Sequence, residues 1–189
     1  GTLTSGSYNI AVGYDAMNGG ATTGYYNIAI GASAGDALTS ASGSILLCKN
    51  AGGAITTGAD NYAIGEGALA TIDGTESLNI AIGRSAMGNS NATNMKRNIA
   101  IGHYAMDGAG TVGGSSDNTF IGYDAGGGTW TTGTCAYNVG IGNYVMDAAM
   151  NGARKNIALG HGAMTSLIDS SGSKFICNNL MSYRVSILY

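Results

Sequence analysis

The residues best suited to chemistry or recognition in this chain follow a glycine that recurs along the sequence. The pair after this glycine is often aromatic, cationic or acidic, as in Tyr14-Asp15 and His103-Tyr104. Such side chains bind sugars and proteins. The candidates for surface recognition are Tyr14, Arg84, His103, Tyr104, Tyr123, Tyr144 and, in the insert 126–137 of one of the longest repeats, Trp130. The alternative is that they are ordinary exposed side chains.

The sequence does not predict a metal site or a catalytic centre. His103 and His161 share one repeat position, and three turns of a stacked coil would separate them by about 14 Å, too far for one chain to chelate a metal. Three chains could gather copies of one histidine, but the same position also holds Tyr14, Glu66, Arg84, Tyr123 and Asn143, a mixture typical of a solvent-facing column. The chain lacks a phosphate-binding loop, an HExxH or CxxC motif and a nucleophile elbow. Its carboxylates, such as Asp15 and Asp124, are scattered, so we expect no metal, no cofactor and no enzymatic activity.

A repeated phrase must position these side chains. Its cleanest copies are Asn-Ile-Ala-Ile-Gly-Arg-Ser-Ala-Met at 79–87 and Asn-Ile-Ala-Ile-Gly-His-Tyr-Ala-Met at 98–106. Good copies begin at Asn9, Asn27, Asn61, Asn79, Asn98, Asn118, Asn138 and Asn156, and worn copies begin at 44 and 174. The ten starts are 17–20 residues apart. A fixed period of this size predicts a repeat architecture.

Each phrase predicts a short strand. Its three apolar residues are too few for a helix, the following glycine weakens one, and β-branched residues favour strands. Alternate side chains point to opposite faces, so Ile80 and Ile82 share one face and Ala81 lies on the other. We expect the isoleucine face to fill the inside of a coil. The alanine face then needs a close-packed partner, which we expect to be other copies of the chain, with a seam at Ala11, Ala29, Ala63, Ala81, Ala100 and Ala158.

Three further columns have structural interpretations. The glycine after each strand suits a bend with positive φ or a tight backbone approach; it recurs as Gly13, Gly31, Gly65, Gly83, Gly102, Gly122, Gly142 and Gly160, and Cys48 is the misfit. The repeated asparagine can bond local backbone and stack into a ladder between turns. The methionine column, which includes Met87 and Met106, is more typical of core filler than of recognition. Phe120 and Gly140 interrupt the alanine column, so packing should change there.

The expected fold class is therefore all-β: a repetitive parallel β-solenoid or β-roll of about ten turns, or rungs, forming an intertwined or side-by-side homotrimer. The array should cover 1–178, and 179–189 should be a C-terminal cap or an exit segment toward a further domain. A net charge of -3 gives no basic surface for nucleic acid. The apolar runs are far too short for a membrane span, and three cysteines imply no disulfide framework.

The phrase Asn-x-Ala-Ile-Gly-x-x-Ala resembles the head repeats of trimeric autotransporter adhesins, and it is similar to repeats in bacteriophage tail fibres. The resemblance covers about 9–178. It implies a left-handed parallel β-roll that trimerises about a long axis. The adhesin repeats are about fourteen residues long, whereas these are 17–20, which favours the phage-fibre type or a related fibre.

The expected function is that of a structural and adhesive fibre segment, on a virion tail fibre or a bacterial surface. Its expected partners are itself, as a homotrimer, adjoining fibre segments, and a host surface glycan or protein receptor. Two alternatives stay open. An ice-binding solenoid would need a flat threonine column, and Thr-Thr recurs at only 22–23, 56–57 and 131–132. A polysaccharide-processing, tailspike-like solenoid would need clustered carboxylates in a groove.

Overall fold

The computed structural model describes residues 6–20, 22–72, 74–90, 94–109, 114–130, 133–165, 172 and 174–176. In this part of the chain the regular elements are all strands, and no helix is present. The strands are β1 (Ile10–Val12), β2 (Ile28–Ile30), β3 (Ile45–Leu47), β4 (Tyr62–Ile64), β5 (Ile80–Ile82), β6 (Ile99–Ile101), β7 (Thr119–Ile121), β8 (Val139–Ile141), β9 (Ile157–Leu159) and β10 (Lys174–Ile176). The predicted cap at 179–189 lies outside the described residues.

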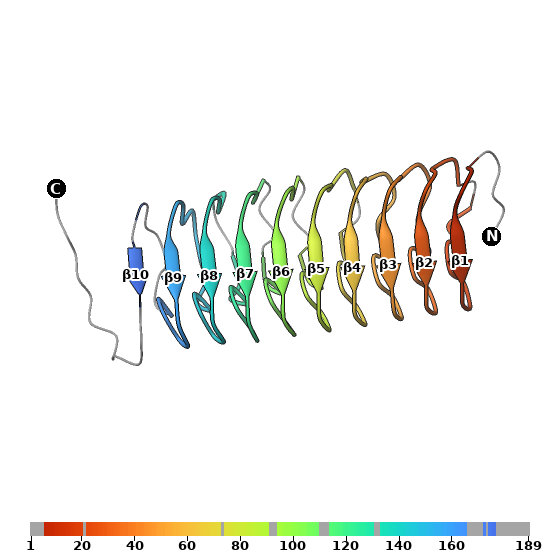
Figure 1. The fold of residues 1–189 in the computed structure, drawn as a ribbon. Helices are drawn as coiled ribbons and strands as arrows, with labels where there is room; N and C mark the ends of the chain where they lie inside the picture. Colours follow the sequence, from red (N-terminus) through yellow and green to blue (C-terminus); the bar gives the residue numbers. More distant parts are fainter. Residues whose placement is uncertain are drawn as a thin grey trace.

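The strands form one parallel sheet in strict sequence order, β1 to β10. Each pairs in register with the next, so that Ala81 of β5 lies beside Ala100 of β6. Between strands the chain makes one loop around the coil and returns one strand further along, as Figure 1 shows. The predicted parallel β-solenoid is confirmed, with about eight turns.

The assignment of the two strand faces in the sequence analysis is wrong. The alanines point into the coil: Ala29, Ala63, Ala81, Ala100 and Ala158 are all completely buried within one chain. Ala11, in the end strand β1, is exposed together with its neighbours. The five buried alanines therefore form no seam between subunits. The isoleucines point outward instead, with Ile10 50% exposed and Ile30 43% exposed.

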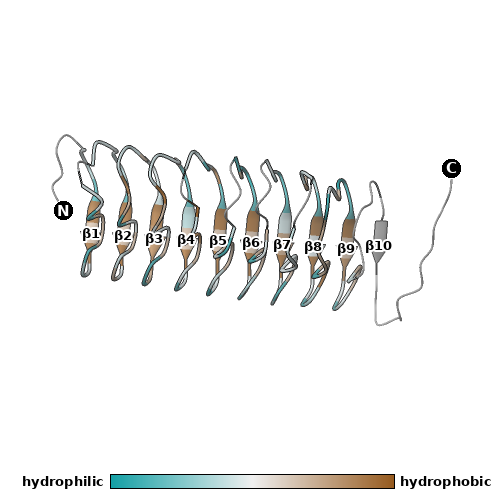
Figure 2. Cartoon of the chain, turned by 180° about the vertical axis from the view of Figure 1, so that it is seen from behind, coloured by the Kyte–Doolittle hydropathy of each residue, from teal (hydrophilic) through white to brown (hydrophobic). Residues whose placement is uncertain are grey.

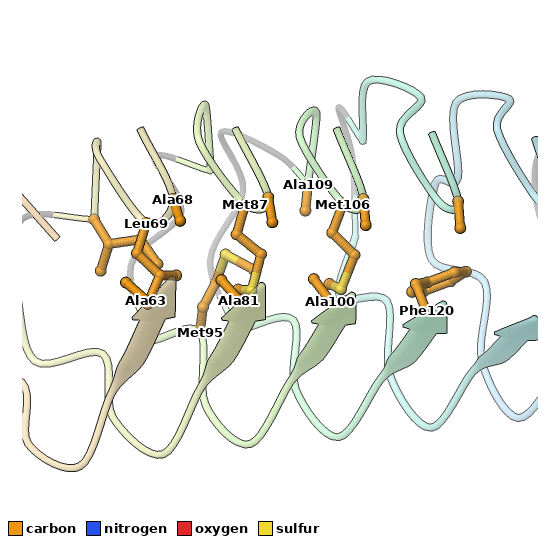
Figure 3. Packing of buried hydrophobic residues seen from close by; sticks show 14 of the residues in the cluster. Ala63, Ala68, Leu69, Ala81, Met87, Met95, Ala100, Met106, Ala109 and Phe120 are labelled. Carbon is orange, nitrogen blue, oxygen red and sulfur yellow. The ribbon is translucent and has the colours of Figure 1, made fainter. Parts of the chain in front are cut away.

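The narrow interior explains this orientation. The loops send a second set of large side chains across the coil toward the strand, including Leu69, Met87 and Met106, all fully buried. Figure 3 shows these side chains pointing at Ala63, Ala81 and Ala100. Interiors are packed to the density of organic crystals, so a residue as small as alanine must face each methionine. The methionine column is core filler, as predicted.

The rung of β7 exchanges the sizes of these partners, at the break that Phe120 and Gly140 predict. Phe120 is buried in β7. The residue opposite it, in the place of a methionine, is Gly126, and the residue beside it in β8 is Gly140. A β carbon on Gly140 would come within 2.7 Å of the Phe120 ring. The packing does change here, because the small residue moves to the other side of the coil.

The repeated asparagines form the predicted ladder. Asn98 Nδ2 donates to Oδ1 of Asn79 on one side at 3.2 Å and to the carbonyl of Ser115 at 3.0 Å. Its own Oδ1 accepts from the backbone N and from Nδ2 of Asn118. The same pattern links successive asparagines from Asn61 to Asn156, and Ser44 takes the place of one at β3. Each buried amide is thus satisfied, which is what burial requires.

The glycines after the strands adopt the expected backbone conformation. Gly13 has φ +134° and Gly65 has φ +136°. A β carbon on Gly65 would lie 2.5 Å from the carbonyl oxygen of Gly83 in the next turn. Both the left-handed backbone and the close approach therefore require glycine. Cys48 occupies the equivalent place after β3 with φ +92° and is exposed.

Candidate functional site

An apolar strip runs along the outside of the sheet. It consists of the first and third residues of each strand from β1 to β9, none of which is buried. We call these eighteen residues the outer strip: Ile10, Val12, Ile28, Ile30, Ile45, Leu47, Tyr62, Ile64, Ile80, Ile82, Ile99, Ile101, Thr119, Ile121, Val139, Ile141, Ile157 and Leu159. In Figure 2 it forms a hydrophobic band, paler at β4 and β7, where Tyr62 and Thr119 stand.

A continuous stack of aromatic side chains borders this strip at the corner after the strands. The ring centroids of Tyr104 and Tyr123 are 5.9 Å apart, those of Tyr123 and Tyr144 are 5.3 Å apart, and those of Tyr144 and His161 are 5.6 Å apart. The Arg84 guanidinium carbon lies 5.9 Å from the centroid of the Tyr104 ring, within cation–π distance. We call these five residues, from five successive turns, the aromatic column.

The coil brings these side chains together by placing one short corner segment above the next. The column alternates between the first residue after the glycine (Arg84, Tyr123, His161) and the second (Tyr104, Tyr144). The second residue has positive φ, +59° in Tyr104 and +56° in Tyr144. The backbone N–H of Tyr123 also donates to the side-chain oxygen of Asn143 at 2.9 Å. These contacts fix the corner so that neighbouring rings meet.

A shallow hollow continues the same corner toward the N-terminal turns. Its volume is about 280 Å³, and its lining consists of Ser33, Lys49, Asn50, Glu66, Gly67, Arg84 and Ser85. An ion pair between Lys49 Nζ and Glu66 Oε1, 3.4 Å long, crosses it. Because Arg84 belongs to both features, the polar hollow and the aromatic column form one continuous surface along the corner.

Carboxylates accompany the column. Burial is the main cause that raises the pKa of Asp107, Asp124 and Asp147 above the ordinary value. The charges of Asp147 and Asp107 raise the pKa of Asp124 further. Partial desolvation also raises the pKa of the Tyr123 hydroxyl, as do the neighbouring tyrosines and Asp124.

The structure brings together four of the predicted recognition residues: Arg84, Tyr104, Tyr123 and Tyr144. His103 is exposed on the same corner, beside Tyr104. Tyr14 is 78% exposed but lies in the first turn, far along the coil from the column. His161 is not among the recognition residues predicted from the sequence, although it follows Gly160 directly, as Tyr123 follows Gly122.

Trp130 is not a surface residue, and this candidate is wrong. Its side chain is only 2% exposed, and its ring packs 5.9 Å from that of Phe120. Its Nε1 is a buried donor with no hydrogen-bond partner among the described residues. Packing against Phe120 of β7 removes this large aromatic side chain from water, which favours burial over display.

Several threonines in the part of the chain that the structure describes bond to the next turn. Thr22 is buried, and its hydroxyl donates to the carbonyl of Leu38 in the next turn. Thr39 and Thr57 donate in the same way to carbonyls one turn on. The pair at 131–132 lies outside the described residues. These hydroxyls therefore act as links between turns.

The opposite border of the outer strip carries a different set of contacts. The rings of Tyr8 and Tyr26 stack at 5.1 Å with an interplanar angle of 10°. Arg97 Nε lies 2.6 Å from Asp117 Oδ1, and a second bond joins Nη2 to Oδ2. Aromatic and charged residues thus flank the strip on both sides.

Within the described residues, no group of three or more histidine, cysteine, aspartate and glutamate side chains could hold a metal ion. Nor does any helix there have the length and apolarity to cross a membrane. Comparisons of the chain with protein-family models, curated proteins and solved structures gave no match. The surfaces that carry a functional argument are therefore the outer strip and the corner that holds the hollow and the aromatic column.

Proposed function

We propose that the chain is a structural and adhesive fibre segment, a ten-rung solenoid that associates side by side as a homotrimer through the outer strip. The observation that carries this proposal is the unbroken apolar face outside the sheet. A parallel sheet normally has both faces covered. Here the inner face is covered by the loops of the same coil, and no described residue covers the outer face.

The size of the outer strip supports an interface. The strip is three residues wide, about 10 Å, and nine strands tall, about 40 Å, which gives a flat area on the order of 400 Å². Apolar patches of this size or larger on monomers are often functional. This is about half of the roughly 800 Å² that each partner contributes to a standard interface, and the border opposite the aromatic column, with Tyr8, Tyr26, Arg97 and Asp117, can extend it.

Its composition supports a second copy as the partner. The strip is made of β-branched and leucine side chains with almost no polar group, which is typical of homo-oligomer interfaces rather than of transient ones. It runs straight along the coil with one repeat spacing, so that an identical strip matches it along the whole length. Three copies around an axis parallel to the coil would bury all three strips. The resemblance to trimeric fibre repeats favours the same number.

The setting follows from this architecture. A trimer of stacked coils is an elongated rod, suited to extending a binding tip or to touching a surface along its side. We propose an extracellular location, on a virion tail fibre or a bacterial surface, with attachment as the role. The recognition surface would be the corner outside the seam.

Light scattering on the intact chain tests the proposal. We expect a trimer that resists detergent until boiled. The double variant Ile82→Lys, Ile101→Lys places charges at the centre of the outer strip without touching the core, and it should yield folded monomers. Ser40→Lys with Thr129→Lys is the matched control, because both residues are exposed away from the strip; it should stay trimeric. A monomeric wild-type chain would overturn the proposed seam.

A further inference from the structure

We propose that the aromatic column, from Arg84 to His161, is a binding track for an uncharged oligosaccharide laid along the solenoid axis. This inference deepens the attachment role proposed above and rests on it for its biological setting. The fold does not need the column, the spacing of its side chains suits a polymer, its charges select against anions, and a polar hollow extends it.

The fold does not require aromatic residues at this corner. The same two positions in earlier turns hold Ala32 and Ser33, Lys49 and Asn50, or Glu66 and Gly67. The coil closes in the same way in those turns, with the same strand register. Tyr123 and Tyr144 nevertheless stay 42% and 39% exposed. Exposed aromatic rings that contribute little to the core are the usual material of recognition surfaces.

The geometry suits a repeating ligand. Successive members of the column come from successive strands of the sheet, spaced about 4.8 Å apart, so five members span about 19 Å. The C–H faces of pyranose rings stack on aromatic rings, and sugar hydroxyls accept or donate hydrogen bonds to phenol, amide and carboxylate groups. A linear glycan repeats such faces and hydroxyls along its length. The column is a single file of side chains, which fits a chain-like ligand better than a broad protein surface.

The charges at this corner select the class of glycan. Asp124 follows Tyr123 directly in the chain, and the backbone N–H of Asp107 donates to the carbonyl of Tyr104 at 3.1 Å, so carboxylate residues accompany the tyrosines. The charge of His161 also lowers the pKa of Asp147. These carboxylates would repel sulfated or uronic-acid polymers and the phosphates of nucleic acids. Arg84 lies at one end of the column, with its guanidinium carbon 5.9 Å from the centroid of the Tyr104 ring. The hydroxyl groups of an uncharged sugar chain can instead donate hydrogen bonds to these carboxylates.

The polar hollow extends the track. It begins where the aromatic column ends, at Arg84, and offers hydroxyl and amide groups from Ser33, Asn50 and Ser85. A sugar at the end of the chain can place its hydroxyls there while the following rings lie on the tyrosines. A long ligand is therefore bound by hydrogen bonds at one end and by stacking on aromatic rings along the rest of its length.

The test measures binding of defined hexasaccharides to the intact chain by isothermal titration calorimetry. The uncharged probes are cellohexaose, chitohexaose, maltohexaose and mannohexaose, and the anionic comparison is hexagalacturonic acid. We expect at least one uncharged probe to bind with a millimolar or tighter Kd, and the anionic probe to bind more weakly. Tyr123→Ala with Tyr144→Ala should weaken that binding about tenfold or more. Tyr14→Ala with Tyr137→Ala, two exposed tyrosines outside the column, should leave it unchanged.

Two further measurements keep the outcome decisive. NMR titration of the wild-type chain should shift side-chain signals of Arg84 and His161, at the two ends of the column, even if the alanine variants do not fold. Light scattering on folded Tyr123→Ala, Tyr144→Ala protein should give the wild-type mass. Absence of binding by all four uncharged probes, unchanged binding by the folded alanine variant, or tighter binding of the anionic probe would each overturn the track and leave the trimer untouched. A reduced mass would assign the column to the seam and also overturn it.

Discussion

The ring of Phe120 lies directly against Gly126 and fills the space that a side chain would occupy there. A β carbon on Gly126 would come within 2.8 Å of Cδ1 of Phe120. One turn earlier the same two places hold Ala100 and Met106, both fully buried. Each of these turns thus places one large side chain and one small one across the coil, and either side can supply the large one.

This exchange predicts a compensating double variant. Phe120→Ala alone should destabilise the fold by about 3–5 kcal/mol, because it leaves a cavity. Gly126→Met alone should destabilise it by about 1–3 kcal/mol or more through overpacking. Together they recreate the alanine–methionine pair of the neighbouring turn, at a backbone φ of +64° against +53° in Met106. Chemical unfolding should show that the double variant is less destabilised than the sum of the singles; additive losses would contradict the size exchange.

The asparagine ladder should be intolerant of substitution at its centre. Asn98 is fully buried, and its side chain takes part in four hydrogen bonds, to Asn79, Ser115 and Asn118. Asn98→Ala leaves buried partners unsatisfied and should destabilise the fold by about 3 kcal/mol or more. Asn98→Asp should be no better, because it replaces a donor with a charged acceptor facing two oxygens.

Asn9 is the matched control for the ladder. It lies at the end, is only partly buried, and bonds the carbonyl of Gly24 and the amide of Asn27. Asn9→Ala should destabilise the fold by less than half as much as Asn98→Ala in the same unfolding measurement. Equal effects would mean that the cost arises from each local turn and not from the buried ladder.

The misfit at Cys48 predicts a stabilising substitution. Its φ of +92° is a conformation that L side chains rarely adopt, and such strain costs about 1–3 kcal/mol. Cys48→Gly should therefore raise the thermal midpoint, whereas Cys48→Ala, which keeps the β carbon, should not. The reverse change, Gly65→Ala, should destabilise strongly, since its β carbon would meet the Gly83 carbonyl. A neutral or harmful Cys48→Gly would show that the strain is absent.

The carboxylates beside the aromatic column give stability a defined pH dependence. In the folded chain the pKa of Asp124 is raised, first by burial and then by Asp147 and Asp107. The protonated Asp124 side chain contributes its full stabilisation at pH values below its pKa in the unfolded chain. This stabilisation is lost as pH rises through its higher pKa in the folded chain. At pH 7 the ionised group therefore destabilises the fold. Asp124→Asn should raise the thermal midpoint at pH 7 but not at pH 3. The gain in unfolding free energy should be less than about 1 kcal/mol, because the side chain is only partly buried.

Asp117 should respond with the opposite sign. Its pKa is lowered, chiefly by the hydrogen bonds from Arg97. The ionised Asp117 side chain stabilises the fold at pH values above its pKa in the unfolded chain. This stabilisation is lost as pH falls through its lower pKa in the folded chain. Asp117→Asn should therefore lower the thermal midpoint slightly at pH 7 and have no effect at low pH. Parallel pH profiles for the two variants would contradict these assignments.

The sequence by itself determined the positions of the strands, the period of the coil and the roles of its invariant columns. Three apolar residues between an asparagine and a glycine admit a strand but not a helix, and a period of 17–20 residues admits one coil per repeat. The ladder at Asn98 and the bend at Gly65 followed because few residues satisfy a buried turn or a positive φ. These features depend on local chemistry, which the sequence carries.

Only the tertiary structure decided which strand face is inside. In Ile80-Ala81-Ile82 both faces are apolar, so alternation alone cannot rank them. The decision depends on volume: Met87 crosses the coil to reach the strand, and only alanine leaves room for it. The same competition for space buried Trp130. Closure of the coil also creates the aromatic column. It brings together side chains that are roughly twenty residues apart in the chain: Arg84, Tyr104, Tyr123, Tyr144 and His161.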